Sequence, residues 1–533
     1  MADIRILVTD PLAEEGIRLM QAENHVKVDV KTKIPEEQLL GVIGDYDGLV
    51  VRSGTQVTKD VLLKAKRLKV IGRAGAGLDN IDVEAASKQG IIVMNAAGGN
   101  TISTAEHTMS LIMSLSRNIP QACATMRDGK WDRNKFMGVE LYGKYLGIVG
   151  MGKVGSEVAR RAHGFGMRLM VYDPYLSVEK TRELDAEPVT NLEDLYKKAD
   201  YITVHTPLTA ETKALIGAKQ IAIMKKGVRL INCARGGIID EKALVEAIKA
   251  GHVAGAALDV FEQEPPTSPV TKELISLPQV VVTPHLGAST EEAQNNVAKE
   301  IAISVRDYLL GKGVRNAVNV PCVDPEVLKL IEPYLKLIES MGAMQAQLLE
   351  GHVRTVKIRY VGEITRLELA PLTISFIKGL LTPALQESVN YVNAAMIAKD
   401  RGIKVIESKA IEAEDFANLI ATTVETDKAV TEIRGTLFTR TDPRIVQIND
   451  FHMDAIPSGD MLLVRNQDSP GMIGQIGTAL GSRGINIGWM TFGRKSQGGE
   501  ALVVVNVDQP LTPEITAQIQ KLPKVLEVKL IKL

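Results

Sequence analysis

The sequence predicts an α/β protein with two doubly wound parallel sheets, the first in a discontinuous domain, followed by an α+β domain and a small ferredoxin-like domain. Three observations predict this plan. Two series of short apolar segments alternate with helical patterns, which is typical of parallel βα units. A glycine-rich turn follows the first strand of the second series. The last stretch of roughly 75 residues reads β-α-β-β-α-β, which is the ferredoxin-like order.

Length and composition exclude several classes of protein. The chain has 533 residues, and at roughly 150 residues per domain this length predicts three to four domains. Hydrophobic residues make up 45% and charged residues 24%, so disorder and coiled coil are disfavoured. Lys and Arg number 63 against 64 Asp and Glu, which gives a net charge of −1, and no basic block is present. We therefore expect neither a nucleic acid nor a membrane as a partner.

The first residues and the cysteines indicate a cellular compartment. The N-terminal segment is not typical of a signal peptide, because acids at positions 3 and 10 flank no long apolar core. No apolar run approaches the roughly 18 residues of a membrane span. Cys123, Cys233 and Cys322 are far apart and odd in number, which disfavours both a disulfide framework and a Cys-x-x-Cys metal site. We predict a cytoplasmic protein without a metal site.

The first series predicts five strands, each followed by a helix or a turn. These strands are expected at residues 4–10, 26–30, 48–53, 69–75 and 91–96. An amphipathic helix is then expected from Thr101 to about Met126, interrupted by Pro120, and it would carry the chain into another domain.

The second series predicts a second parallel sheet. Its strands are expected at residues 145–152, 168–174, 201–207, 229–237, 253–261 and 280–287. A long helix follows, opened by Ser289 or Thr290 with acids close behind them in a plausible cap. Because this helix is long enough to cross back, we expect the first domain to be built from both flanks of the second.

The remaining chain predicts two further domains. Residues from about 320 to 457 mix helices with strands and contain no motif with recognisable chemistry, and the Pro-Ser-Gly of residues 457–459 precedes the ferredoxin-like unit. The predicted division is 1–98 with 287–319, then 99–286, 320–457 and 458–533.

The glycine-rich turn has the pattern Gly-x-Gly-x-x-Gly at Gly150, Gly152 and Gly155, between an apolar strand and a helical segment. Glycine allows the tight turn and lets backbone N–H groups approach a pyrophosphate at the start of the helix. Asp173 ends the next strand, near the offset expected for an acid that binds a ribose. The pattern favours a Rossmann-like dinucleotide site, and Asp173 favours NAD over NADP because a carboxylate repels a 2′-phosphate. The alternatives are a plain glycine-rich turn and a solvated Asp before Pro174.

Three polar residues follow strands of the second sheet, at the edge where doubly wound folds bind ligands. They are Arg235, Glu264 and His285. Hydride transfer from a secondary alcohol requires a base, and histidine titrates near neutral pH. A carboxylate would raise the pKa of that histidine, and arginine can hold a substrate carboxylate. Taken singly, a surface charge, a loop acid before Pro265 and a helix cap remain alternatives, but together these residues indicate a 2-hydroxy-acid dehydrogenase.

The first sheet would supply the other wall of the site. Arg52 and Ser53 end one strand and Arg73 ends its neighbour, so we predict that they bind an anionic substrate. Arg133 and Lys135 are weaker cationic candidates. The alternative is that strand-end arginines are only solvated charge.

Several longer motifs resemble the D-2-hydroxy-acid dehydrogenase family. They span residues 50 to 290 and include VRSGTQVT, IGRAGAGLDNID, GIVGMGKVG, VYDPY, HTPLT, INCARGGIIDE, ALDVFEQEPP and TPHLGAST. The resemblance implies that His285 is the acid/base, Glu264 its partner and Arg235 the substrate anchor. It also implies a set of cofactor contacts, which comprises Gly150, Gly152, Lys153, Val154, Gly155, Asp173, Thr206, Cys233 and Asp259. Ala76 stands where relatives often carry Thr, so a hydroxyl contact to the cofactor is in doubt there.

The last domain resembles the ACT domain, a small ligand-sensing fold, over residues 465–487. The resemblance implies that such modules pair across a subunit contact and hold an amino acid between them, with Asn466, Asp468 and Asn486 as candidate ligands. Asn486 would open the next strand across the gap from Asp468. A ferredoxin-like packing unit with ordinary turn residues is the alternative. We expect an L-serine effector and a homo-oligomer, with a tetramer favoured.

The family resemblance and the cations together predict the reaction. Residues 320–457 resemble, more loosely, the extra domain of the long form of this family, which oxidises 3-phospho-D-glycerate (3-phosphoglycerate) to 3-phosphooxypyruvate with NAD at the entry to serine synthesis. Two alternatives stay open. One is a relative that acts on glyoxylate, hydroxypyruvate or another D-2-hydroxy acid, and the other is an NAD-sensing regulator without turnover.

Overall fold

The computed structural model describes residues 3–176, 181, 185–321, 325–385, 389–412 and 415–533, and Cys322 lies outside them. Its first sheet is five-stranded and parallel, in the order β2-β1-β3-β4-β5. The strands are β1 (Ile4–Val8), β2 (Val26–Val30), β3 (Gly48–Val51), β4 (Val70–Arg73) and β5 (Ile92–Asn95). The helices between them are α1 (Glu14–Met20), α2 (Glu36–Val42), α3 (Lys59–Lys64) and α4 (Val83–Lys88).

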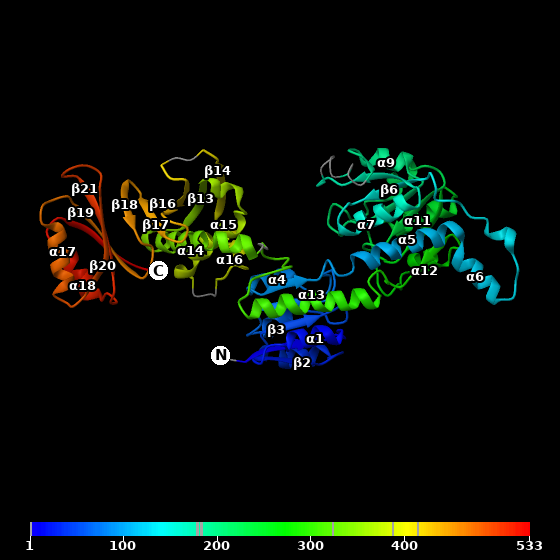
Figure 1. The fold of residues 1–533 in the computed structure, drawn as a ribbon, viewed down its shortest axis with the longest axis horizontal. Coiled ribbons are helices and arrows are strands. Elements are labelled where there is room, and N and C mark those ends of the chain that lie inside the picture. Colours follow the sequence, from blue (N-terminus) through cyan, green and yellow to red (C-terminus); the bar gives the residue numbers. More distant parts are fainter. Residues whose placement is uncertain (1–2, 177–180, 182–184, 322–324, 386–388, 413–414) are drawn as a thin grey trace.

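A helix from far along the chain completes this first unit. Helix α13 (Glu291–Leu309) packs against α1 and β4, and Figure 1 shows it lying across the first sheet. Its apolar side, with Val297, Ile301 and Val305, is buried in one core with strand residues of the first sheet. Thr290 caps the helix by accepting a hydrogen bond from the Ala293 N–H. The first domain is therefore discontinuous, as the sequence predicts.

The second sheet has seven strands in the order β12-β11-β10-β9-β6-β7-β8. The strands are β6 (Tyr145–Val149), β7 (Arg168–Tyr172), β8 (Ala186–Pro188), β9 (Tyr201–Val204), β10 (Val228–Asn232), β11 (Val253–Leu258) and β12 (Val280–Val282). The pairs are parallel throughout. The helices after the glycine loop are α7 (Lys153–Gly164), α9 (Leu192–Lys198), α10 (Ala218–Ile223), α11 (Glu241–Lys249) and α12 (Pro269–Ser276). The order reverses beside β6, which places the glycine loop where doubly wound folds bind ligands.

The connecting helix is divided in two. Helix α5 (Thr101–Arg117) ends at Asn118, which has a φ of 52°, and α6 (Ile119–Arg127) begins directly after it. Asn tolerates this left-handed conformation better than most residues do. Pro120 lies in the first turn of α6, where its missing N–H costs nothing.

The third sheet follows in a mixed domain, with the order β14-β13-β15-β16-β17-β18. Its strands are β13 (Val353–Gly362), β14 (Lys404–Ala410), β15 (Asn418–Thr426), β16 (Val430–Leu437), β17 (Pro443–Ile448) and β18 (Phe451–Ala455). Its helices are α14 (Pro325–Leu348), α15 (Ala370–Leu381) and α16 (Ala394–Asp400). Only the β13–β14 pair is parallel. This is the α+β arrangement that the sequence predicts.

The C-terminal unit has the ferredoxin-like order. Its elements are β19 (Asp460–Gln467), α17 (Met472–Gly481), β20 (Ile487–Arg494), β21 (Glu500–Val507), α18 (Pro513–Gln520) and β22 (Val525–Lys532), and the sheet order is β20-β21-β19-β22. Successive residues of β19 point to opposite faces of the sheet. Leu462 and Val464 lie in a core with α17 and α18, whereas Met461 and Leu463 lie in a core with α14 and the third sheet. Both faces are buried, so the two C-terminal units share one apolar core.

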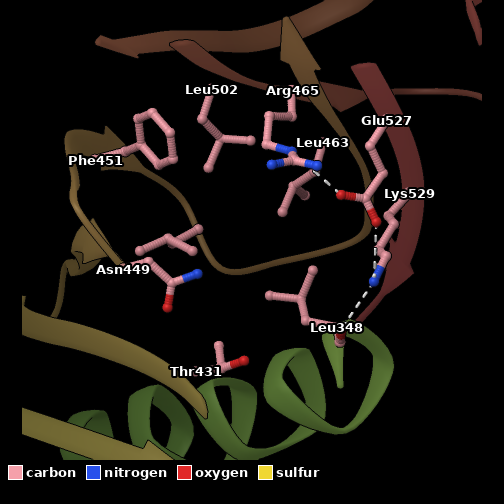
Figure 2. A pocket seen from close by; sticks show the side chains of 10 residues that line it. Leu348, Thr431, Asn449, Phe451, Leu463, Arg465, Leu502, Glu527 and Lys529 are labelled. Carbon is pink, nitrogen blue, oxygen red and sulfur yellow. Dashed lines mark hydrogen bonds and ion pairs between the residues drawn. The ribbon is translucent and has the colours of Figure 1, made fainter. Parts of the chain in front are cut away.

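Charged groups border this shared core in a cavity of about 130 Å³. Figure 2 shows Arg465 and Glu527 above the end of α14. Arg465 Nε lies 3.4 Å from Glu527 Oε2. Lys529 pairs with Glu527 and donates to the Leu348 carbonyl at 2.8 Å. The charges are paired across the junction, although Arg465 Nε makes no hydrogen bond in the described structure, and we assign the cavity no ligand.

Candidate functional site

A cleft of about 590 Å³ lies between the first and second sheets. Its walls contain residues that follow β4, the glycine loop, and the loops after β9, β10, β11 and β12. The predicted residues that line it are Gly152, Lys153, Val154, Thr206, Cys233, Arg235, Asp259 and His285. Strands far apart in sequence therefore bring most of the predicted site together.

The glycine loop has the shape that a dinucleotide requires. Gly150 has a φ of 92°, and a Cβ there would lie 2.7 Å from the His205 carbonyl oxygen. A Cβ at Gly155 would collide with the Gly150 carbonyl. A Cβ at Gly152 would meet nothing within 4 Å, so the backbone at the start of α7 is open to the cleft. This opening lies at a helix N-terminus, which favours a pyrophosphate.

Asp173 lies beside this loop. Its carboxylate accepts hydrogen bonds from the N–H of Met151 at 2.7 Å and the N–H of Tyr175 at 2.9 Å. The acid is thus attached to the glycine loop itself, as a ribose-binding acid would be.

Two predicted contact residues, Thr206 and Cys233, provide a second test of whether the cleft suits a dinucleotide. The Thr206 hydroxyl is buried and has no hydrogen-bond partner in the described structure, so it can donate to a bound dinucleotide. Burial raises the pKa of the Cys233 thiol to about 12, so this residue offers a neutral contact. These residues fit the group that the glycine loop predicts.

Asp259 organises the loop that carries the histidine. Its carboxylate accepts hydrogen bonds from the Thr283 hydroxyl at 2.5 Å and from the N–H groups of Leu286 and Gly287. His107, from α5, places Nε2 3.2 Å from the same carboxylate and 3.0 Å from the Thr283 hydroxyl. Burial alone raises the pKa of Asp259, but the hydrogen bonds from His107 and Thr283 outweigh it and hold the pKa below its usual value. Asp259 is therefore an anion at neutral pH.

His285 and Glu264 form a close pair. His285 Nδ1 lies 2.6 Å from Glu264 Oε2, and the Phe261 N–H donates to the other Glu264 oxygen at 3.1 Å. His285 has a φ of 55°, and its N–H donates to the Asp259 carbonyl at 2.9 Å. The hydrogen bond to Glu264 raises the pKa of His285 above its ordinary value. Because Nδ1 faces the carboxylate, Nε2 is the nitrogen that can exchange a proton.

Arg235 reaches across the cleft. Its guanidinium lies 3.5 Å from the Asp79 carboxylate of the opposite wall and donates to the Ala234 carbonyl at 2.7 Å. Asn232 fixes the loop by donating to the Arg235 carbonyl and accepting from the Ala234 N–H. The arginine is thus held between the two walls.

The predicted cations of the first sheet lie beside the cleft but do not line it. Burial lowers the pKa of Arg73, and the neighbouring positive charges of Arg235 and Arg52 lower it further, while Asp79 opposes them. These three arginines therefore form one positive region. Ser53 is exposed, next to Arg52.

The weaker candidates Arg133 and Lys135 belong to an exposed 3₁₀ turn after α6 and do not line the cleft. Ala76 lines the cleft with its methyl group, so its side chain offers no hydroxyl to a cofactor.

The predicted effector residues lie at two ends of the fourth sheet. Asn466 is buried, and its side-chain oxygen has no partner in the described structure. Asp468 accepts from Arg494 and from the Gly498 N–H, both at 3.1 Å. Asn486 donates to Asp508 beyond the other end of β21, a strand length of about 23 Å away at roughly 3.3 Å per residue. Within one chain, Asn486 does not meet Asp468.

Sequence reasoning missed the side chains that support the site. His107, Thr283, Asp10 and Asn80 contact site residues, but the sequence analysis gave none of them a role. Asn80 and Thr283 lie inside the quoted motifs IGRAGAGLDNID and TPHLGAST, whereas His107 and Asp10 lie in no quoted motif. His205 lines the cleft too, and burial lowers its pKa to about 4, so it is neutral there. No group of three or more metal-type ligands occurs among the residues that the structure describes. Across the same residues, no helix has the length and apolar character to cross a membrane.

Family models match three parts of the chain. Residues 109–287 match the D-isomer specific 2-hydroxyacid dehydrogenase NAD-binding domain, residues 330–449 the D-3-phosphoglycerate dehydrogenase intervening domain, and residues 461–524 the ACT domain. The D-3-phosphoglycerate dehydrogenase of Methanocaldococcus jannaschii is 45% identical over 99% of this chain and 100% of its own length. The chain belongs to the D-3-phosphoglycerate dehydrogenase family. The enzyme of that name from Bacillus subtilis is 44% identical over 99% of both chains.

A solved structure supports the catalytic fold of this D-3-phosphoglycerate dehydrogenase family member. The TT0316 protein of Thermus thermophilus is 34% identical, with a TM-score of 0.54, and the alignment covers 59% of this chain and 100% of that one. The match to the NAD-binding domain confirms the predicted cofactor, NAD, and the ACT match confirms the predicted C-terminal fold.

Proposed function

We propose that this chain oxidises 3-phospho-D-glycerate to 3-phosphooxypyruvate with NAD, at the entry to L-serine synthesis. The observation that carries the proposal is one cleft that joins the open glycine loop to the His285–Glu264 pair and Arg235, with Arg52 and Arg73 beside it. Both relatives described above are named D-3-phosphoglycerate dehydrogenase, and this chain matches them over 99% or more of their length.

The mechanism follows from the site geometry. Arg235 binds the substrate carboxylate and the neighbouring oxygen, which fixes C2 against the cofactor face of the cleft. His285 Nε2 accepts the proton of the C2 hydroxyl, and Glu264 stabilises the resulting imidazolium through Nδ1. The hydride from C2 would go to bound NAD and the hydroxyl proton to His285, so the two electrons and the proton are accounted for. The residues that would hold NAD in the cleft are Lys153 and Val154 of the glycine loop, with Thr206 and Cys233.

Asp173 sets the cofactor preference in this proposal. It would accept hydrogen bonds from the adenosine ribose hydroxyls while its negative charge disfavours a 2′-phosphate. Its existing hydrogen bonds to the glycine loop keep the carboxylate in place.

The substrate phosphate would lie beside Arg52, Ser53 and Arg73. Two or more fixed cations favour a substrate with a second anionic group over glyoxylate, glycerate or lactate. The test is the initial rate of NADH formation with 3-phosphoglycerate, glycerate and D-lactate. A clear preference for 3-phosphoglycerate is expected, and equal rates would support another D-2-hydroxy-acid dehydrogenase. No turnover with any of them would support the NAD-sensing regulator.

Regulation by L-serine is part of the proposal. Because Asn486 lies at the opposite end of the sheet from Asp468, a site that uses both residues needs two ACT domains in antiparallel contact. Serine at millimolar concentration is expected to inhibit the full-length enzyme, and Asn486→Ala to weaken that inhibition. Point substitution is preferable to removing residues 458–533, because truncation would uncover the core shared with α14.

A homo-oligomer, with a tetramer favoured, is also proposed. Helix α6 and the loop after it extend outward from the second sheet (Figure 1) and carry exposed Met126, Trp131 and Met137, of which Met137 is 86% exposed. Such a patch is typical of an interface, and we assign it to a second copy. Light scattering tests the assembly. We place the enzyme in the cytoplasm and divide the chain at 1–98 with 287–319, 99–286, 320–457 and 458–533.

A further inference from the structure

We propose that Asn80 is a positioning residue that sets the preference for an anionic substrate. It would do so by holding Arg73 and the loop of residues 52–55 in one arrangement. The inference rests on the proposed function, because it concerns the same phosphate-binding side of the cleft.

The Asn80 side chain makes three hydrogen bonds, and two of them go to Arg52 and Arg73, which are predicted to bind the substrate. Asn80 is 8% exposed and lies in the turn after β4. Its amide nitrogen donates to the carbonyls of Arg52 and Thr55, both at 2.6 Å. Its oxygen accepts from Arg73 Nε at 3.3 Å. One neutral side chain therefore connects the two arginines that follow neighbouring strands.

Asp10 holds the same loop from the other side. Its buried carboxylate accepts from the N–H of Arg52 at 2.6 Å and from the N–H of Thr55 at 3.1 Å. Asn80 satisfies the carbonyls of these two residues, and Asp10 satisfies their N–H groups. The base of the loop is thus fixed by two buried side chains, while Ser53 and Gly54 at its tip remain exposed.

The neutrality of Asn80 is as important as its geometry. Arg73 loses hydration through burial and lies near the charges of Arg235 and Arg52. An amide oxygen can orient its guanidinium without cancelling the charge that attracts the substrate, whereas a carboxylate would cancel part of it. The preceding residue, Asp79, instead pairs with Arg235.

The test compares Asn80→Ala and Asn80→Asp with the parent enzyme. Asn80→Ala removes the donor to the carbonyls of Arg52 and Thr55 and the acceptor of Arg73 Nε, which frees both arginines to move, so KM for 3-phosphoglycerate should rise about 10- to 100-fold. The KM for NAD should stay within about twofold. The ratio of kcat/KM for 3-phosphoglycerate to that for D-glycerate should fall at least tenfold. Asn80→Asp keeps the acceptor for Arg73 and the size of the side chain, and should also lower this ratio because it adds a negative charge.

Asn319 provides the matched control. Its side chain also makes three hydrogen bonds, at 2.9 Å each, to the Val93 N–H, the Ser87 hydroxyl and the Ile91 carbonyl, at the start of β5. Asn319→Ala removes the same number of hydrogen bonds from the same domain. These bonds lie at the start of β5, whereas those of Asn80 lie beyond the ends of β3 and β4. The Asn319 substitution should lower the melting temperature like Asn80→Ala but leave the substrate ratio unchanged.

Three outcomes would overturn the inference, and they are distinguishable. If Asn80→Ala and Asn80→Asp keep the parent ratio, Asn80 only stabilises the fold, while the proposed function stands. If Asn319→Ala lowers the ratio as much, the effect comes from stability alone. If the parent enzyme itself shows no preference for 3-phosphoglycerate, the proposed substrate fails together with the role of Asn80.

Discussion

Replacing Glu264 with Gln tests the His285–Glu264 pair. The substitution keeps the size of the side chain but removes the negative charge that lies 2.6 Å from His285 Nδ1. Two unit charges about 4 Å apart attract by about 4 kcal/mol near a protein surface and by about 1 kcal/mol in water. The side chains of His285 and Glu264 are 51% and 36% exposed, respectively, so solvent screens the pair and about 1.5 kcal/mol is a fair value. At 1.36 kcal/mol per unit, the pKa of His285 should fall by about one unit.

The effect of this pKa shift on the forward and reverse rates follows from the proposed role of His285. Oxidation requires neutral His285, so kcat/KM rises with pH through a pKa that Glu264 holds above 6.5. Reduction requires the protonated form and falls through the same pKa. In Glu264→Gln both limbs should move about one unit to lower pH, and reduction should slow by about tenfold at pH values well above the pKa and by less at neutral pH. Initial rates of NADH formation and consumption across the pH range measure both limbs.

Glu262 supplies the control for this experiment. It lies two residues away and is exposed, and among the described residues its side chain makes no hydrogen bond to His285. Its backbone N–H donates to the buried Glu241. Glu262→Gln should leave both limbs in place. The reasoning would be refuted by unchanged limbs in Glu264→Gln or by an equal shift in Glu262→Gln.

Three further substitutions test other parts of the site. His285→Ala should lower kcat by about 10² to 10⁴ with NAD affinity nearly intact, and turnover like that of the parent enzyme would contradict its role. Asp173→Ala should raise KM for NAD and narrow the gap to NADP, whereas equal use of both cofactors by the parent enzyme would exclude the proposed role of the carboxylate. Gly236→Ala should destabilise the protein by about 1–3 kcal/mol or more in urea unfolding, because a Cβ there would collide with the Phe261 carbonyl. An unchanged urea midpoint would show that the Arg235 loop can shift.

The sequence predicted the sheets well because their strands are short apolar runs between turn residues. All five strands of the first sheet lie within the predicted segments, and five of the seven in the second do. Strand β10 begins one residue before its predicted segment. Strand β8 was not predicted, because it is a three-residue edge strand that reads Ala-Glu-Pro and has no apolar run. The predicted interruption near Pro120 is present, but it occurs at Asn118, since proline is tolerated in the first turn of a helix.

The proposed reacting groups could be predicted for a geometric reason. Parallel strands end at one edge of a sheet, so Arg235, Glu264 and His285 had to lie near one another once each was placed after a strand. The effector residues lacked such a constraint. Asn486 and Asp468 flank the same helix in sequence, yet a helix and its return segment separate them by the length of the sheet.

The contacts of the supporting side chains cannot be predicted from strand ends in this way, because their partners are distant in sequence and are often backbone atoms. Asn80 donates to a carbonyl 28 residues away, and His107 faces a carboxylate 152 residues away. Neither contact follows a helical or strand period. Their positions nonetheless decide where the predicted residues point, since His107 bonds to Asp259 and Asn80 bonds to both Arg73 and the Arg52 carbonyl. Motifs therefore identify which groups react, whereas the three-dimensional hydrogen bonds around them identify what fixes the geometry on which rate and specificity depend.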